Sequence, residues 1–130
     1  MVTLRFRLKN LAVGAANLAI TEAGRELYRP WVYSQGIEDW GVADTLGNSF
    51  GTLTAVFVIV GLVGKDTSDD YRLIALIAGG LAIYELLQGP MGGAIDPRDI
   101  VASLVAGVVA GLIYRVLNKH PVSFKKGPAA

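Results

Sequence analysis

Several residue types that support common chemistries are missing or scarce in this sequence. It contains no cysteine, which excludes disulfides, thiolate metal sites and a cysteine nucleophile. Its single histidine, His120, excludes a multi-histidine metal centre. Charged residues are only 18% of the chain, against about 25% in an ordinary soluble domain. We therefore expect no metal, no cofactor, no enzymatic activity and no nucleic-acid partner.

What remains is strongly apolar, with 52% hydrophobic residues in a chain of 130. Residues 45–64 carry no charge, residues 73–95 carry only Glu85, and residues 100–114 and 10–21 are also uncharged. A membrane-spanning helix needs about 20 apolar residues. We predict an all-α four-helix transmembrane bundle with spans near residues 8–28, 45–64, 72–89 and 99–117. Residues 1–117 then form one membrane domain, and residues 118–130 form a basic cytoplasmic tail.

Two alternative readings exist for parts of this pattern. Three basic residues followed by an apolar stretch near the N-terminus are typical of a signal peptide, but we expect this segment to be retained as the first helix. A soluble helical bundle is the second alternative. Residues 52–64, TLTAVFVIVGLVG, lack the polar face that a soluble amphipathic helix shows, which favours the membrane.

The charges divide between the two sides of the predicted membrane. The side with both termini holds nine of the 12 basic residues, namely Arg5, Arg7, Lys9, Lys65, Arg72, Arg115, Lys119, Lys125 and Lys126. The opposite side holds eight of the 11 acids, namely Glu22, Glu26, Glu38, Asp39, Asp44, Glu85, Asp96 and Asp99. Basic loops favour the cytoplasm, so we expect a multi-pass protein of the bacterial inner membrane with both termini cytoplasmic.

Small residues recur at four-residue spacing in each predicted helix. The stripes are Ala15-Ala19-Ala23, Gly47-Gly51, Ala75-Gly79 and Ser103-Gly107-Gly111. Small residues let helix backbones approach closely in lipid. They predict either the internal packing of a bundle or a face that docks a membrane-protein partner, and the sequence leaves both open.

The polar residues of the outer side are the candidate functional residues. Glu85 lies within an apolar helix, where an ionisable side chain marks a functional site by default, and Gln88 is one turn away. Asp96-Pro97-Arg98-Asp99 is typical of a helix start, so capping alone also explains these acids. Capping is equally open for Asp44. We predict one shared cluster at the outer side in which Arg98, together with Arg25 or Arg29, neutralises the acids. The sequence leaves open whether this cluster is a structural network or a binding cleft.

The chain also contains a short repeated pattern. Asp44 is followed by Asn48 and Gly51, and Asp99 by Ser103 and Gly107. In each case the residues share one helix face. The pattern predicts two parallel helical hairpin repeats.

The second half of the chain resembles the VanZ-like family of small polytopic bacterial membrane proteins. The residues that carry the resemblance are Glu85-x-x-Gln88 and Asp96-x-x-Asp99 with Ser103 and Gly107, and Asp44-Asn48-Gly51 resembles the second part again. Ser103 stands where the family usually has Asn, and Arg98 lies directly before Asp99. The resemblance implies an association with glycopeptide resistance and a site at Glu85, Gln88, Asp96, Arg98, Asp99, Asp44 and Asn48.

Three functional hypotheses follow. The first is a VanZ-like protein whose outward-facing acidic cluster binds a cell-envelope ligand or a cation. The second is a non-catalytic accessory subunit of a larger respiratory or photosynthetic membrane complex. The third is a small transporter or ion-binding protein that uses Glu85.

Overall fold

The computed structural model describes residues 1–122, and these contain helices and loops but no strand. The elements are α1 (Leu4–Ala23), the π-helix η1 (Gly24–Tyr28), α2 (Arg29–Gln35), α3 (Val42–Val63), α4 (Asp70–Gln88) and α5 (Pro97–Asn118). The all-α prediction is confirmed. The predicted tail begins at the end of α5, and its residues 123–130 lie outside the described part of the chain.

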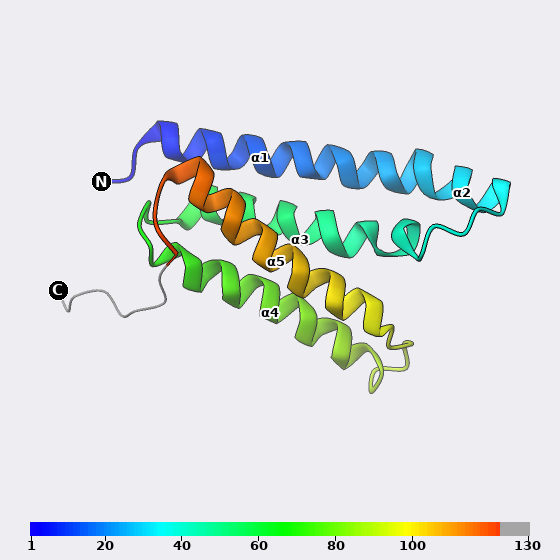
Figure 1. The fold of residues 1–130 in the computed structure, drawn as a ribbon. Helices are drawn as coiled ribbons and strands as arrows, with labels where there is room; N and C mark the ends of the chain where they lie inside the picture. Colours follow the sequence, from blue (N-terminus) through cyan, green and yellow to red (C-terminus); the bar gives the residue numbers. More distant parts are fainter. Residues whose placement is uncertain (123–130) are drawn as a thin grey trace.

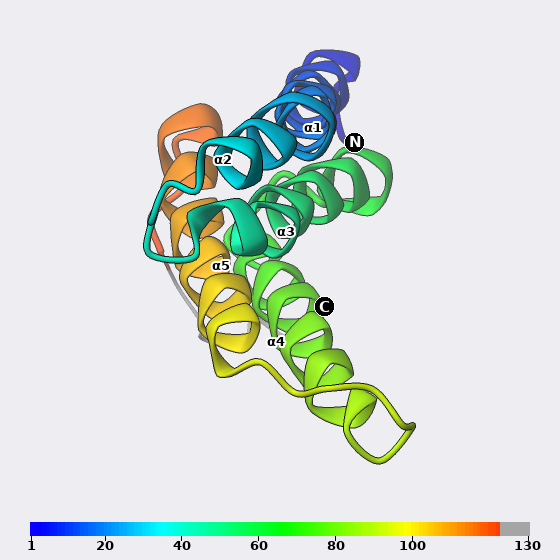
Figure 2. The same cartoon turned by 90° about the vertical axis from the view of Figure 1, so that its right-hand side faces the viewer.

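The helices form two antiparallel hairpins, the first up to α3 and the second of α4 and α5, which pack together at one end. α1, η1 and α2 follow one another and pack along α3, while α4 packs along α5, and α5 also crosses α3 (Figure 1). We call the end that holds the N-terminus and the α3–α4 loop the terminal end, and the other end the loop end. The hairpins lie close together at the terminal end. At the loop end, α4 and the α4–α5 loop project away from α1 and α2 (Figure 2).

The first helix is longer than its predicted span. It begins at Leu4, where the Thr3 hydroxyl accepts a hydrogen bond from the Phe6 amide, as N-cap residues do. It continues without a break through the π-turn of η1 into α2 and ends where Gly36 adopts φ +60°. The left-handed conformation at Gly36 is the usual stop signal of a helix.

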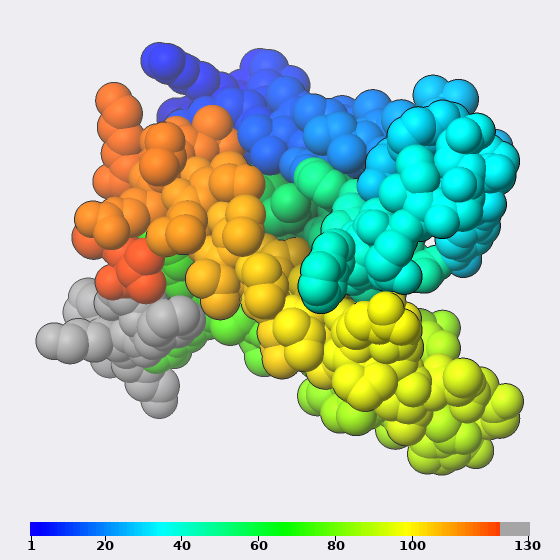
Figure 3. Space-filling view, turned by 45° about the vertical axis from the view of Figure 1, so that its right-hand side comes forward, coloured from blue at the N-terminus to red at the C-terminus, as the bar shows by residue number. Residues whose placement is uncertain are grey.

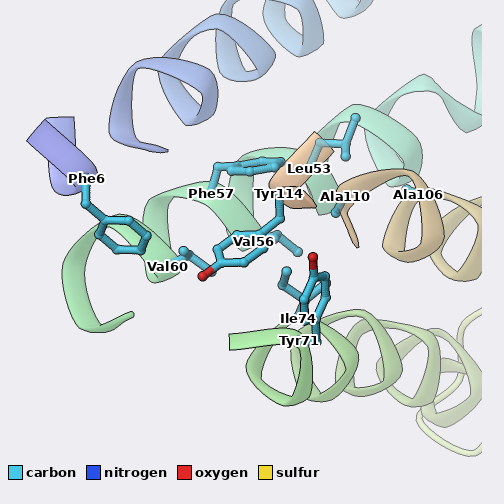
Figure 4. Close-up of a cluster of buried hydrophobic side chains, with 10 residues drawn as sticks. All are labelled: Phe6, Leu53, Val56, Phe57, Val60, Tyr71, Ile74, Ala106, Ala110 and Tyr114. Carbon is cyan, nitrogen blue, oxygen red and sulfur yellow. The ribbon is translucent and has the colours of Figure 1, made fainter. Parts of the chain in front are cut away.

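The hydrophobic core lies toward the terminal end. Tyr114 of α5 is fully buried, and its ring meets Phe6 of α1 and Tyr71 of α4 edge-on at centroid distances of 6.5 and 5.1 Å. Val56 and Val60 of α3 complete the surroundings of this ring (Figure 4). All four long helices therefore meet around one aromatic side chain.

The small residues mediate packing at some of the predicted positions only. Gly107 lies so close to α4 that an added Cβ would be 2.5 Å from the Ala78 Cβ, which supports the stripe predicted on α5. On α1 the packing residue is Gly14, where a Cβ would meet Val58 of α3 at 2.8 Å. The Ala15-Ala19-Ala23 stripe, in contrast, is exposed.

The stripe predicted on α3 also takes no part in packing. A Cβ added at Gly47 or Gly51 would meet nothing within 4 Å. The reason is that α1 and α5 approach α3 through other faces, at residues such as Leu53 and Phe57, which are buried. Spacing alone did not distinguish these faces.

Within residues 1–122, two helices, α3 and α5, are long and apolar enough to cross a membrane. In the most apolar window of α5 only 22% of the residues are buried. The outward side chains of α5 include Val101, Leu104, Val105, Val108 and Leu112, whereas the buried ones include Ser103, Ala106 and Ala110. α5 therefore points its small residues inward and its large apolar residues outward.

Candidate functional site

Glu85, Gln88 and Asp99 form a polar group between α4 and α5 at the loop end. The Gln88 side-chain amide donates a hydrogen bond of 3.0 Å to the Glu85 carboxylate, one helical turn away. The charge of Asp99 acts on Glu85 across the hairpin. The Oδ1 atom of Asp99 is buried and makes no hydrogen bond with the described residues. This group thus brings two carboxylates together, and they receive fewer hydrogen bonds than their oxygens can accept.

Asp96 acts as the N-cap of α5. Its side chain accepts a hydrogen bond of 2.9 Å from the Arg98 amide, and Pro97 follows as the first helical residue. The capping interpretation of Asp96 is therefore confirmed. Asp99 lies in the first turn of the same helix, where a negative charge is favourable beside the unpaired amides.

Arg98 lies between the two hairpins at the loop end. Its guanidinium is 3.5 Å from Asp96, and it lies against Gly41, where an added Cβ would be 2.6 Å from Nη1. The Arg98 side chain is 63% exposed. It thus differs from the buried partner that the sequence predicted, because the acid that it pairs with is the half-buried cap of its own helix.

Asp44 belongs to a second group, formed with the first helix. Arg29 lies 3.7 Å from Asp44, and the Tyr33 hydroxyl donates a hydrogen bond to the same carboxylate. Arg29 Nε in turn donates to the Tyr33 hydroxyl at 3.1 Å, and this hydrogen bond raises the pKa of Arg29. Asn48 follows one turn along α3 and is half-buried. Asp44 therefore already has a cation and a donor.

The predicted cluster is thus divided into two groups with Arg98 between them. Figure 3 shows the α2–α3 and α4–α5 loops as two separate protrusions at this end. Arg25 joins neither group, because it pairs with Glu22 at 2.7 Å and Glu26 at 3.4 Å on its own helix. A groove of about 370 Å³ beside Arg98, with Trp40 and Val101 among its lining residues, lies on the same side.

The N-cap position of α3 is Gly41, and the side chain that caps the helix is that of Asp39, which sequence reasoning missed. Its carboxylate accepts hydrogen bonds from the amides of Gly41 at 3.2 Å and Ala43 at 2.8 Å, and the Tyr28 hydroxyl donates to it at 3.2 Å. Asp44 lies in the first turn instead. The glycine at position 41 indicated a turn. Its φ of +79°, which allows the Asp39 carboxylate to reach the helix start, could not be read from the sequence. The capping interpretation of Asp44 is wrong because the helix begins earlier than predicted.

A buried polar network at the terminal end was also missed. Asp70 is 2% exposed and accepts hydrogen bonds from the amides of Lys65 at 2.8 Å and Asp66 at 3.0 Å. The Tyr114 hydroxyl donates to Asp70 Oδ2 at 2.6 Å, the same oxygen that accepts from the Asp66 amide, and it lies 3.0 Å from the Thr67 carbonyl oxygen. Asp70 thereby fixes the α3–α4 loop to α5.

The end of α5 is held by further polar contacts. Asn10 and Asn118, both buried, exchange hydrogen bonds at 3.2 and 3.3 Å between α1 and α5. His120 Nε2 lies 2.8 Å from Asp66, and the Tyr71 hydroxyl donates to the His120 carbonyl at 2.6 Å. These polar groups are paired with one another across α1, α5 and the α3–α4 loop, so we interpret this network as structural.

Residues 1–122 contain no group of three or more His, Asp or Glu side chains that could hold a metal ion. Comparison of the chain with protein-family models, with curated proteins and with solved structures finds no match. The VanZ-like resemblance and the site drawn from it therefore stay predictions.

Proposed function

We propose that the chain is an integral membrane protein with four membrane-spanning helices. The observation that carries this proposal is the surface of α5, where large apolar side chains such as Leu104 and Val108 point outward and Ala106 and Ala110 point inward. A helix with an outward apolar face requires an apolar environment, and lipid supplies it. α4 carries the same kind of surface at Leu76.

Both termini lie on the cytoplasmic side of a bacterial inner membrane in this proposal. The basic residues of the terminal end support it. Two of them also hold helix ends together: Arg7 donates to the carbonyl of Gly61 at 3.0 Å, and Lys9 to that of Leu117 at 2.8 Å. Cations near the last carbonyls of α3 and α5 interact favourably with the negative ends of the helix dipoles.

Single cysteines test this topology, since the natural chain has none. Ser34→Cys lies at the end of α2, and Ser123→Cys follows the last described residue. We expect a membrane-impermeant maleimide to label intact cells at position 34 only, and both positions after the cells are opened. Labelling of position 123 in intact cells would contradict the proposed orientation.

We further propose that Glu85, Gln88 and Asp99 form an outward-facing site, as the VanZ-like resemblance implies. Its support is the Asp99 oxygen, which is buried beside a second carboxylate and has no hydrogen-bond partner among residues 1–122. A ligand that donates hydrogen bonds or carries positive charge would satisfy both acids. The proposed occupant is therefore a cell-envelope ligand or a cation.

Expression in a glycopeptide-susceptible strain tests this function. We expect the wild-type chain to raise the inhibitory concentration, and Glu85→Gln to abolish the increase while the protein stays in the membrane. Glu38→Gln is the matched control, because Glu38 is an exposed acid of the α2–α3 loop. If both variants behave like the wild type, Glu85 has no role in resistance.

A non-catalytic accessory subunit is the second candidate. It is favoured by the Ala15-Ala19-Ala23 stripe, which the fold leaves exposed. In lipid such a stripe allows a partner helix to approach closely. Purification in mild detergent should then recover a partner in near-stoichiometric amount, and Ala19→Leu should release it. Recovery of the chain alone from the native membrane would exclude a stable subunit.

A further inference from the structure

A narrow apolar groove runs between α4 and α5 near the terminal end. It has a volume of about 410 Å³. Small residues form much of it, with Ala75 and Gly79 on α4 and Gly107 and Gly111 on α5. An added Cβ at Gly79 would meet no atom of residues 1–122 within 4 Å, so the described part of the chain leaves the space above this residue open.

The groove has the length of one lipid leaflet. On α4 it extends from Tyr71 to Gly79, which is about 12 Å at 1.5 Å per residue. Half of the hydrocarbon core of a bilayer is about 15 Å. Dividing the volume by this length gives a cross-section of about 34 Å², which is about 6 Å on a side. A helix is about 10 Å across. The groove therefore fits a single extended acyl chain better than a partner helix or a second copy of the chain.

A cation lies at the end of the groove that would face the membrane surface. Arg115 follows Gly107 and Gly111 at four-residue spacing and so continues the same stripe of α5. Its charge acts on Tyr71, which lines the groove. Arg115 is exposed, as a group that contacts a headgroup must be.

Two of the three acids near this end have partners of their own. Asp70 accepts two backbone amides and lies against the Tyr114 hydroxyl, and Asp66 lies against His120. Asp69, the third acid of the α3–α4 loop, is half-buried just before α4. Basic residues at the cytoplasmic end of a pocket between membrane helices are typical of anionic-lipid sites.

We propose that this groove binds an acyl chain of an anionic phospholipid from the leaflet on the terminal side, with Arg115 at the phosphate. The inference rests on the proposed insertion of the chain in a membrane. It adds a specific lipid partner at a place remote from the acids of the loop end. The occupant is the lipid itself, held by its chain in the groove and its charge at Arg115.

Native mass spectrometry of the full-length, delipidated chain in detergent tests the proposal. The protein is titrated with dioleoyl phosphatidylglycerol and, separately, with dioleoyl phosphatidylcholine. We expect the wild-type chain to prefer the anionic lipid by about fivefold, the effect of about one basic residue at a membrane surface. Arg115→Gln should abolish this preference, and Arg5→Gln, which changes an exposed cation of α1, should keep it.

Gly79→Leu tests the groove itself. It fills the open space above Gly79 and should lower the binding of both lipids about tenfold. Gly80→Leu is the matched control, because Gly80 is exposed, has open space around its Cβ and does not line the groove. Gly111→Leu blocks the groove from α5 and should act like Gly79→Leu. Circular dichroism and the unfolding midpoint of each variant show that it is folded.

Several results would overturn the proposal. Equal binding of the two lipids by the wild-type chain would show that Arg115 does not recognise the headgroup. Equal binding by the Gly79 and Gly80 variants would show that the lipid does not occupy the groove. A dimer that Gly79→Leu dissociates would make a second copy the occupant. Release of the wild-type chain from membranes by alkaline carbonate would instead refute membrane insertion, and so separates failure of the proposed function from failure of the lipid site.

Discussion

The hydroxyl of Tyr114 should contribute strongly to stability through Asp70. Both side chains are buried, at 0% and 2% exposure, and their oxygens lie 2.6 Å apart. Tyr114→Phe removes this hydroxyl but keeps the ring that packs on Phe6 and Tyr71. Asp70 then retains only two backbone amides as donors, and burial prevents water from replacing the third.

The magnitude follows from the charge of the acceptor. A hydrogen bond to a charged group contributes about 1.5–3 kcal/mol, so we expect Tyr114→Phe to lower the free energy of unfolding by about 2 kcal/mol. Tyr84→Phe is the control, since Tyr84 is 57% exposed on α4, and it should change stability by less than about 0.5 kcal/mol.

Unfolding in mixed micelles of a mild detergent and dodecyl sulfate measures both variants. A double-mutant cycle with Asp70→Asn isolates the pair, and we expect a coupling energy of about 1–2 kcal/mol. If Tyr114→Phe and Tyr84→Phe unfold at the same detergent fraction, the hydroxyl does not stabilise the fold. A coupling energy near zero would show that Tyr114 acts without Asp70.

Three further predictions use the same assay. Asp96→Ala should destabilise the chain by about 0.5–2 kcal/mol through loss of the α5 cap, and Asp96→Ser should recover most of this; equal effects of the two would exclude capping. Asp39→Ala should cost about 1–2 kcal/mol because Asp39 caps α3, and an unchanged midpoint would refute that role. Gly14→Ala should destabilise through contact with α3, whereas Gly47→Ala, with open space around it, should stabilise by up to about 1 kcal/mol; the reverse order would contradict the observed packing.

The helices could be predicted from the sequence because their signal is continuous. Residues 45–64 carry no charge, and this length of apolar chain favours a helix wherever it is buried or in lipid. The cap at Asp96 was also predictable, since Asp-Pro is a local signal. The start of α3 was not, because its cap at Asp39 depends on the left-handed backbone of Trp40 and Gly41.

The packing faces and the terminal-end network could not be predicted, because they depend on pairs that are distant in the sequence. Asn10 and Asn118 are 108 residues apart, and each alone is only a polar residue in or beside an apolar helix. α1 likewise offers two small faces, one at Gly14 and one at Ala15 and Ala19, and only contact with α3 selects between them. The spacing of small residues along one helix identifies its possible packing faces, but it does not show which helix packs against each face.

The two ends of the chain differ in how fully their polar groups are satisfied, and this difference bears on the proposed site. At the terminal end Asp70 has three donors, and the asparagines of α1 and α5 pair with each other. At the loop end the hairpins diverge, and one buried oxygen of Asp99, next to Glu85, has no partner in the described part of the chain. Opening the terminal end would break several buried hydrogen bonds at once, whereas the loop end can admit a ligand without such a loss. A ligand that donates hydrogen bonds there would remove the unsatisfied acceptor, so binding at the loop end should stabilise the fold rather than strain it.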